Sequence, residues 1–264
     1  MLFKFPKKKI TLDCFTSEAE VYDNCKINYG KTFFPEWFKK TKAFVGRDGI
    51  QPTIKHCYGL QEFYRSAVII PSWFSLSLMV KKDLDNKLIY EWAASGPGLR
   101  EMPHDYEQYD KFATTERNFK IRSPWFFRTK EDIKWVWSQP TWSNKDIYDT
   151  MTLLPAVVPY NNVFETNISW MIQDPKDKVK QLNIKPLTPL VAIHAMTEKQ
   201  VEIKNHLVSK KDLERQFNTL SRFFMFDGGP KQKETSVFHH DKKKFYLQVD
   251  FNNKGVKSYD HTKK

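Results

Sequence analysis

The chain has 264 residues, of which 40 % are hydrophobic and 15 % aromatic, a composition that supplies a large apolar core and excludes a disordered chain. It has nine glycines, and it lacks glycine-rich phosphate loops and a Gly-x-Ser-x-Gly turn, so nucleotide-binding enzymes and serine hydrolases lose their usual sequence support. The formal net charge of +12 lies mainly at the ends, with +4 over residues 1–42, +1 over 43–198 and +7 over 199–264, which indicates either solvated ends or ends that attract nucleic acid.

The first half of the chain predicts two short helical segments and a β-hairpin. Pro35 followed by aromatic residues and lysines indicates a short amphipathic segment over 33–45. Residues 58–67 carry apolar side chains at helical spacing. Apolar and small side chains alternate over 74–80 and again over 87–92, with a polar stretch between them, and this pattern predicts two paired strands.

The second half predicts further strands and one longer helix. Alternation predicts strands over 133–137 and 164–172, and the apolar run 190–193 suits a strand that is covered on both faces. Ser209 with Asp212 three residues later resembles a capping box, and an apolar stripe follows it, so we expect a helix near 209–226. Alternation near residues 245–251 predicts a last strand before a disordered lysine-rich tail.

Strands joined mostly by loops favour an antiparallel arrangement over a doubly wound sheet. We therefore expect a mainly β (α+β) fold, either a β-sandwich or a jelly-roll or cupin-like barrel with a few peripheral helices. Residues 1–230 would form one globular domain, and residues 231–264 would form a basic extension with one strand and a disordered tail.

Cysteine usage and the lack of long apolar runs bear on the compartment. Three widely spaced cysteines signal neither a disulfide framework nor a metal knuckle, which favours a reducing environment. Residues 1–9 contain no apolar stretch of signal-peptide length, and no uncharged apolar run of about 18 residues occurs. We expect neither secretion by that route nor a membrane span.

One constellation could carry metal chemistry. Jelly-roll barrels often hold a divalent metal with two histidines and a carboxylate, and the candidate ligands are His104, Asp105 and His194. Adjacent residues of a strand point to opposite faces, so His104 and Asp105 have the wrong spacing for one face, and His194 at the end of an apolar run also fits a core histidine. No other cofactor is signalled.

Aromatic side chains could stack sugars or bases. Most of the tryptophans lie on alternating apolar faces and fit core packing, while the stretch with Trp135, Trp137 and Trp142 is the best candidate for a partly exposed binding surface.

Five short motifs carry a resemblance to a known family. They are residues 53–57 (Thr-Ile-Lys-His-Cys), 68–73 (Val-Ile-Ile-Pro-Ser-Trp), 123–125 (Ser-Pro-Trp), 167–170 (Asn-Ile-Ser-Trp) and 187–190 (Leu-Thr-Pro-Leu). In this order the chain resembles an uncharacterised family of tailed-phage proteins, common in marine and cyanobacterial T4-like myoviruses, with distant bacterial relatives. The resemblance covers roughly residues 30–205 and implies a viral source, hence a location in the virion or the host cytoplasm, but no activity.

Three hypotheses for the function follow. The first is a noncatalytic phage protein, either a virion structural component or a host-directed binding protein, with other phage or host proteins as partners. The second is a cupin-type metal-dependent oxygenase or isomerase that uses His104, Asp105 and His194. The third is nonspecific nucleic-acid binding through the basic ends, with an affinity that falls steeply with salt.

Overall fold

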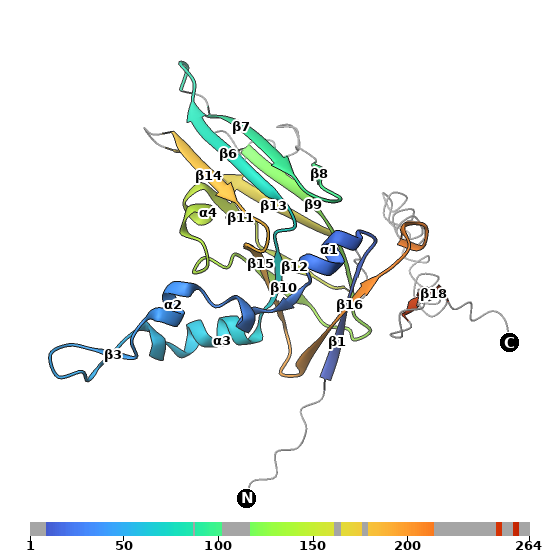
Figure 1. The fold of residues 1–264 in the computed structure, drawn as a ribbon, viewed down its shortest axis with the longest axis horizontal. Coiled ribbons are helices and arrows are strands. Elements are labelled where there is room, and N and C mark those ends of the chain that lie inside the picture. The colour runs from blue at the N-terminus through green and yellow to red at the C-terminus, as the bar shows by residue number, and fades with distance from the viewer. Residues whose placement is uncertain are drawn as a thin grey trace, which may run out of the picture.

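The computed structural model describes residues 9–86, 88–101, 117–160, 165–175 and 179–213, together with the backbone of two short strands, 247–249 and 256–258. Figure 1 shows strands gathered in a layered body and a narrow arm that projects from it. The predicted mainly β fold of sandwich type, with few helices, is confirmed.

The largest sheet joins the first strand of the body to its last. Its strands, in spatial order, are β11 (Met151–Leu153), β13 (Glu165–Ile172), β9 (Arg117–Arg128), β1 (Lys9–Thr16) and β16 (Gln200–Leu207), and β8 (Arg100–Glu101) also pairs with β9. All of these pairs are antiparallel except β1 with β16, which run parallel over eight residue pairs. This parallel pair departs from the expected antiparallel arrangement. It brings together two segments that lie far apart in the chain.

The second sheet is covered on both faces near its centre. Its strands, in spatial order, are β12 (Ala156–Val158), β10 (Trp135–Ser138), β15 (Pro189–Ala195), β5 (Val68–Pro71) and β2 (Asn28–Tyr29). From β15, Val191 and Ile193 enter the main core, while Ala192 packs on the opposite face with Ile69 and Phe63. The prediction of a doubly covered strand over residues 190–193 is therefore confirmed.

The third sheet contains the predicted hairpin. Its order is β14 (Lys180–Ile184), β6 (Ser75–Lys82) and β7 (Leu88–Ser95), with β6 and β7 paired antiparallel over their whole length. Along β6, Leu76, Leu78 and Val80 are buried, while Ser75 and Ser77 are exposed, as alternation predicts.

One apolar core lies between the three sheets, because each contributes buried side chains to the same cluster. Trp73, Trp125, Trp135 and Trp170 are among its largest members, each at most 1 % exposed. Large rings of this kind dominate the burial of apolar area and hence the stability of the sandwich.

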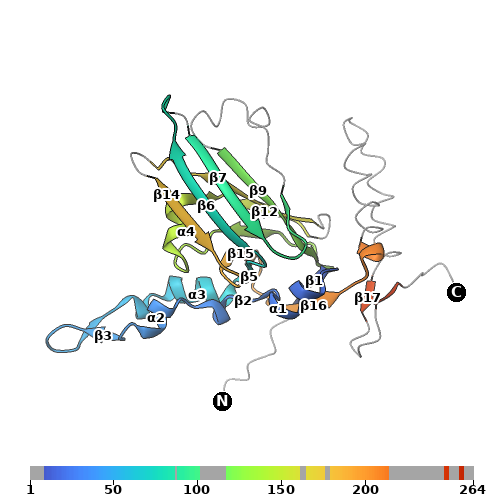
Figure 2. The same cartoon turned by 45° about the horizontal axis from the view of Figure 1, so that its top comes forward.

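The arm comprises residues 30–66, and Figures 1 and 2 show it extending away from the sheets, with β3 toward its far end. Its elements are η1 (Gly30–Phe33), α2 (Glu36–Lys40), β3 (Phe44–Val45), β4 (Gln51–Pro52), η2 (Ile54–His56) and α3 (Tyr58–Ser66). The predictions of a short helix from Tyr58 and of an amphipathic segment near Pro35 are confirmed by α3 and α2.

The arm is held together by a small core of its own and by a close backbone contact at its base. Phe38 of α2 and Leu60 and Tyr64 of α3 form a small separate core. A Cβ atom at Gly30 would collide with the backbone carbonyl of Tyr64, so the close approach of η1 to α3 requires glycine. Just before the arm, the Tyr29 hydroxyl accepts a hydrogen bond of 3.3 Å from the backbone N–H of Ile203 in the edge strand β16.

Two short helices complete the body, α1 (Ala19–Asn24) beside β16 and α4 (Lys145–Thr150) against β11 and β14. The helix predicted from Ser209 begins as expected, since the Asp212 N–H donates to the Ser209 hydroxyl over 3.1 Å and Leu213 is buried. Residues 214–226 lie outside the described part of the chain. Strand β17 (Leu247–Val249), within the predicted last strand, pairs with β18 (Val256–Ser258).

Candidate functional site

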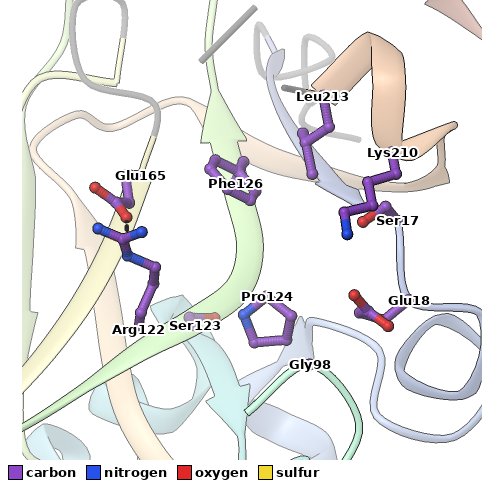
Figure 3. Close-up of a pocket in the computed structure, with 10 residues that line it drawn as sticks. All are labelled: Ser17, Glu18, Gly98, Arg122, Ser123, Pro124, Phe126, Glu165, Lys210 and Leu213. Atoms are coloured by element: carbon purple, nitrogen blue, oxygen red, sulfur yellow. Dashed lines mark ion pairs between the residues drawn. The ribbon is translucent and has the colours of Figure 1, made fainter. Parts of the chain in front are cut away.

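A small pocket lies where the largest sheet meets the start of the C-terminal helix (Figure 3). Its walls come from the segment before α1, the loop after β7, strands β9 and β13, and that helix, and its lining residues are Ser17, Glu18, Gly98, Arg122, Ser123, Pro124, Phe126, Glu165, Lys210 and Leu213. Its volume is about 80 Å³. Sites for small organic ligands usually measure about 300–1,000 Å³, so this pocket suits only a small group or a few water molecules.

The charges of the pocket are balanced internally. Arg122 and Glu165 form an ion pair across neighbouring strands, and Figure 3 shows them on one side of the pocket with Glu18 and Lys210 on the other. Two cations and two carboxylates leave no net charge for a charged substrate to recognise. Gly98 adopts a φ of +63°, and a Cβ atom there would collide with the Glu18 side chain, so glycine allows the loop to close this wall.

The predicted metal ligands are not shown together. His104 and Asp105 lie outside the described residues. His194, on β15, lies at the base of the arm, where its Nδ1 is 3.1 Å from the hydroxyl of Ser66 and its ring packs against Phe63 with centroids 4.8 Å apart. Burial lowers the pKa of His194. Within the part of the chain that the structure describes, no three His, Cys, Asp or Glu side chains gather as a metal site would require.

The predicted tryptophan surface is divided by the fold. Trp135 and Trp137 lie in the core at 0 % and 3 % exposure, and the Trp137 indole N–H donates to the buried Tyr160 hydroxyl over 2.7 Å. Trp142 is 49 % exposed and adjoins Trp37 of α2, which is 42 % exposed. Of the three predicted residues, Trp142 alone is exposed enough to belong to a binding surface. The sequence did not indicate that Trp37 would lie beside it.

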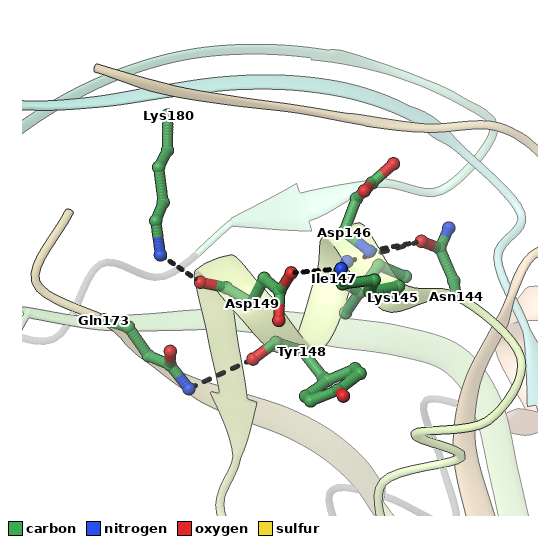
Figure 4. Close-up of polar contacts among 8 residues, drawn as sticks. All are labelled: Asn144, Lys145, Asp146, Ile147, Tyr148, Asp149, Gln173 and Lys180. Carbon is green, nitrogen blue, oxygen red and sulfur yellow. Dashed lines mark hydrogen bonds and ion pairs between the residues drawn. The ribbon is translucent and has the colours of Figure 1, made fainter. Parts of the chain in front are cut away.

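The loop that presents Trp142 is held by hydrogen bonds from Ser143 to Pro140 and by the Asn144 cap of α4, of which Figure 4 shows the cap. Ser143 bonds the carbonyl of Pro140 through both its N–H and its hydroxyl, at 2.9 and 2.6 Å. The Asn144 side chain caps α4 by accepting from the N–H groups of Asp146 and Ile147.

The C-terminal end of α4 is tied to the sheets. In Figure 4, Lys180 of β14 donates to the Asp149 carbonyl, and Gln173 donates to the Tyr148 carbonyl over 3.1 Å. Both ends of α4 are therefore fixed by hydrogen bonds, and Trp142 lies two residues before its capping residue Asn144.

The arm concentrates exposed apolar side chains. Of the 15 large hydrophobic side chains that are exposed among the described residues, six fall between residues 37 and 58: Trp37, Phe44, Val45, Ile50, Ile54 and Tyr58. Ile50 and Tyr58 are 75 % and 73 % exposed. Clusters of exposed apolar side chains on soluble proteins commonly mark interaction sites.

The arm is also basic. Its residues 30–66 include seven lysines and arginines against three acidic residues. The basic residues are Lys31, Lys39, Lys40, Lys42, Arg47, Lys55 and Arg65, and the acidic ones are Glu36, Asp48 and Glu62. The far end is an ordered hairpin, because the Gly49 N–H donates to the Gly46 carbonyl over 3.2 Å and the Thr53 N–H to the Ala43 carbonyl over 3.0 Å. Both glycines have positive φ, at +93° and +62°, which the turn requires.

In the parts of the chain placed by the structure, no helix combines the length and the apolar character needed to cross a membrane. The chain matches no protein-family model, and neither the curated proteins nor the solved structures include a significant match.

Proposed function

We propose that the chain is a noncatalytic binding protein of a tailed phage, acting as a virion structural component or a host-directed protein, and that it contacts a protein partner through the arm. The observation that carries this proposal is the set of six exposed apolar side chains within 22 residues of a projecting element. The phage source rests on the resemblance of the sequence motifs alone.

The chemistry of the far end of the arm favours a protein partner. Phe44, Val45, Ile50 and Ile54 mix one ring with three branched aliphatic side chains, all at least 37 % exposed. Branched aliphatic side chains gain free energy by burial in an apolar groove, at about 25 cal/mol per Å² of area removed from water. The basic excess of the arm favours an acidic rim around that groove.

The pocket in Figure 3 does not suggest a reaction at this place in the sheet, because its volume of about 80 Å³ is small for a substrate and its Arg122 and Glu165 side chains pair with each other. We therefore base the proposal on the arm and not on this pocket.

The experiment compares two glutamate substitutions of exposed apolar residues. Ile50→Glu places a charge on the arm, and Leu84→Glu does the same in the β6–β7 turn, where Leu84 is fully exposed. We expect the Ile50→Glu protein to be lost from purified phage particles, or from its complex in infected cells, while the Leu84→Glu protein behaves as wild type. Equal incorporation of both variants would contradict the role of the arm.

The phage assignment has its own test. Mass spectrometry of purified virions, and affinity purification from infected cells, should find the protein in one of the two places. Absence from the particle together with no recovered partner would refute this assignment.

A further inference from the structure

Trp37 of α2 in the arm and Trp142 of the loop before α4 form a pair of exposed indoles. Their ring centroids are 6.3 Å apart and their planes are tilted by 49°, and the Trp37 indole N–H donates to the Trp142 carbonyl over 2.8 Å. Tryptophan is on average a highly buried residue, yet these two remain 42 % and 49 % exposed. Two large ring faces are therefore held side by side in contact with solvent.

Both rings are positioned before any ligand arrives. Trp37 lies in α2, which packs through Phe38 on α3, and its N–H is already bonded. Trp142 lies in the loop fixed by the two hydrogen bonds from Ser143 to Pro140. A preorganised surface loses little conformational entropy on binding, so the pair is suited to stacking a flat ligand.

The polar groups beside the rings do not favour a sugar. Recognition of a sugar would need side-chain donors and acceptors for its hydroxyls, but the neighbouring groups are engaged within the protein. Glu36 pairs with Lys39 at 2.6 Å, Ser143 bonds Pro140, and Asn144 caps α4.

Exposed lysines follow Trp37 closely in the chain instead. Lys40 lies three residues after Trp37 in α2, and residues at this spacing share a helix face. Lys42 follows shortly after, and both lysines are exposed. Exposed rings beside cations match the chemistry of single-stranded nucleic acid, whose bases offer flat faces and whose phosphates are anionic.

We propose that the Trp37–Trp142 pair stacks bases of single-stranded nucleic acid, while Lys40 and Lys42 contact its phosphates. The observation that carries this proposal is the aromatic pair. Trp37 is one of the six exposed apolar side chains of the arm, but the protein partner is assigned to the aliphatic tip from Phe44 to Ile54. It also places nucleic-acid binding where α2 of the arm meets the loop before α4, rather than in the basic ends of the chain. Double-stranded nucleic acid hides its base faces and would interact through charge alone.

The test measures binding of the full-length protein to a fluorescent oligothymidylate of about 20 nucleotides, long enough for a typical single-strand site. Fluorescence anisotropy at low salt gives the dissociation constant. Trp142→Ala should weaken binding roughly 5- to 150-fold, because stacking is about 1–3 kcal/mol per base and each 1.4 kcal/mol is a factor of ten. Trp142→Phe retains a ring and should keep most of the affinity.

Two further variants separate stacking from charge. Lys40→Glu with Lys42→Glu should weaken binding and reduce its dependence on salt concentration. Trp92→Ala removes a tryptophan that is 37 % exposed on β7, away from the arm, and should bind as wild type. Thermal unfolding of each variant confirms that it folds, and the double glutamate variant tests the proposal even if Trp142→Ala does not fold.

Three results would overturn the proposal. The first is no binding of the oligonucleotide at low salt. The second is equal affinity of wild type and a folded Trp142→Ala protein, which would assign binding to the basic ends. The third is unchanged oligonucleotide binding by a Trp142→Ala protein that no longer joins its complex in infected cells, which would make the aromatic pair part of the protein interface.

Discussion

Tyr160→Phe should destabilise the protein by about 1–3 kcal/mol, because it removes the acceptor of a buried hydrogen bond. The Tyr160 ring is 1 % exposed and packs edge-on against Phe127 with centroids 5.2 Å apart, so the phenylalanine ring can occupy the same space. What is lost is the hydroxyl that accepts the Trp137 indole N–H over 2.7 Å. The indole N–H then stays buried without this partner.

In urea unfolding the effect is a lower urea concentration at the midpoint of the transition, while the dependence of the unfolding free energy on urea concentration stays unchanged. In thermal unfolding the same change corresponds to roughly 2–12 °C, at about 2–4 °C per kcal/mol for a domain of this size. Tyr148→Phe is the control, since Tyr148 is 41 % exposed and should change stability by less than about 0.5 kcal/mol. Adding Trp137→Phe to Tyr160→Phe should cost less than the sum of the single changes, because no N–H remains unsatisfied. Equal stability of the Tyr160→Phe and Tyr148→Phe proteins would refute the core assignment of Trp137.

Three further predictions concern buried groups. His206→Ala should lower the free energy of unfolding in urea by about 3–5 kcal/mol, because it removes a hydrogen bond of 2.8 Å from His206 to the buried Asp13 carboxylate. This hydrogen bond joins β16 to β1, and a decrease below about 1 kcal/mol would contradict its role. Burial lowers the pKa of His194 below its ordinary value of 6.5, so on acidification the unfolded chain takes up a proton before the folded protein does. The contribution of neutral His194 to the free energy of unfolding is therefore present above pH 6.5 and is lost as the pH falls through the lowered pKa. His194→Gln should make the free energy of unfolding depend less on pH in this range. Gly30→Ala should destabilise the base of the arm by about 1–3 kcal/mol, because the added Cβ atom collides with the Tyr64 carbonyl. Relative to wild type, hydrogen exchange should then become faster in α3 than in β6, and an equal increase in both would contradict a local effect.

The strands found from the sequence are those with one buried and one open face. In β6 and β13 every second side chain is buried, so the period of two is visible in the residue types. The helix α3 was found for the same reason, since its buried residues Leu60 and Tyr64 are one helical turn apart.

The strands missed from the sequence hide this period. In β9, Phe119, Ile121, Trp125 and Phe127 are buried at alternate positions, but Pro124 interrupts the pattern. The register with β13 shifts close to Pro124, which has no N–H to donate, and such irregularities are where strands tolerate proline. In β1 most residues are buried on both faces, including Asp13, whose hydrogen bond to His206 comes from a residue 193 positions away. No local pattern shows that partner.

The candidate site was only partly visible for a related reason. Trp142 could be named from the sequence as a binding residue, but its neighbour Trp37 lies 105 residues away and is brought to it by the fold. The exposed tip of the arm could not be predicted, because Val45 and Ile50 resemble core residues by type. They are exposed because no element among the described residues covers them.

The central claim is that the arm binds a protein partner, and site-specific photo-crosslinking tests it most directly. A photoreactive amino acid is placed at position 50 on the arm and, in a second protein, at position 84 in the β6–β7 turn, where both native side chains are exposed. In infected cells we predict one defined crosslinked protein species from position 50 and none from position 84. No species from position 50, or the same species from both positions, would contradict the account.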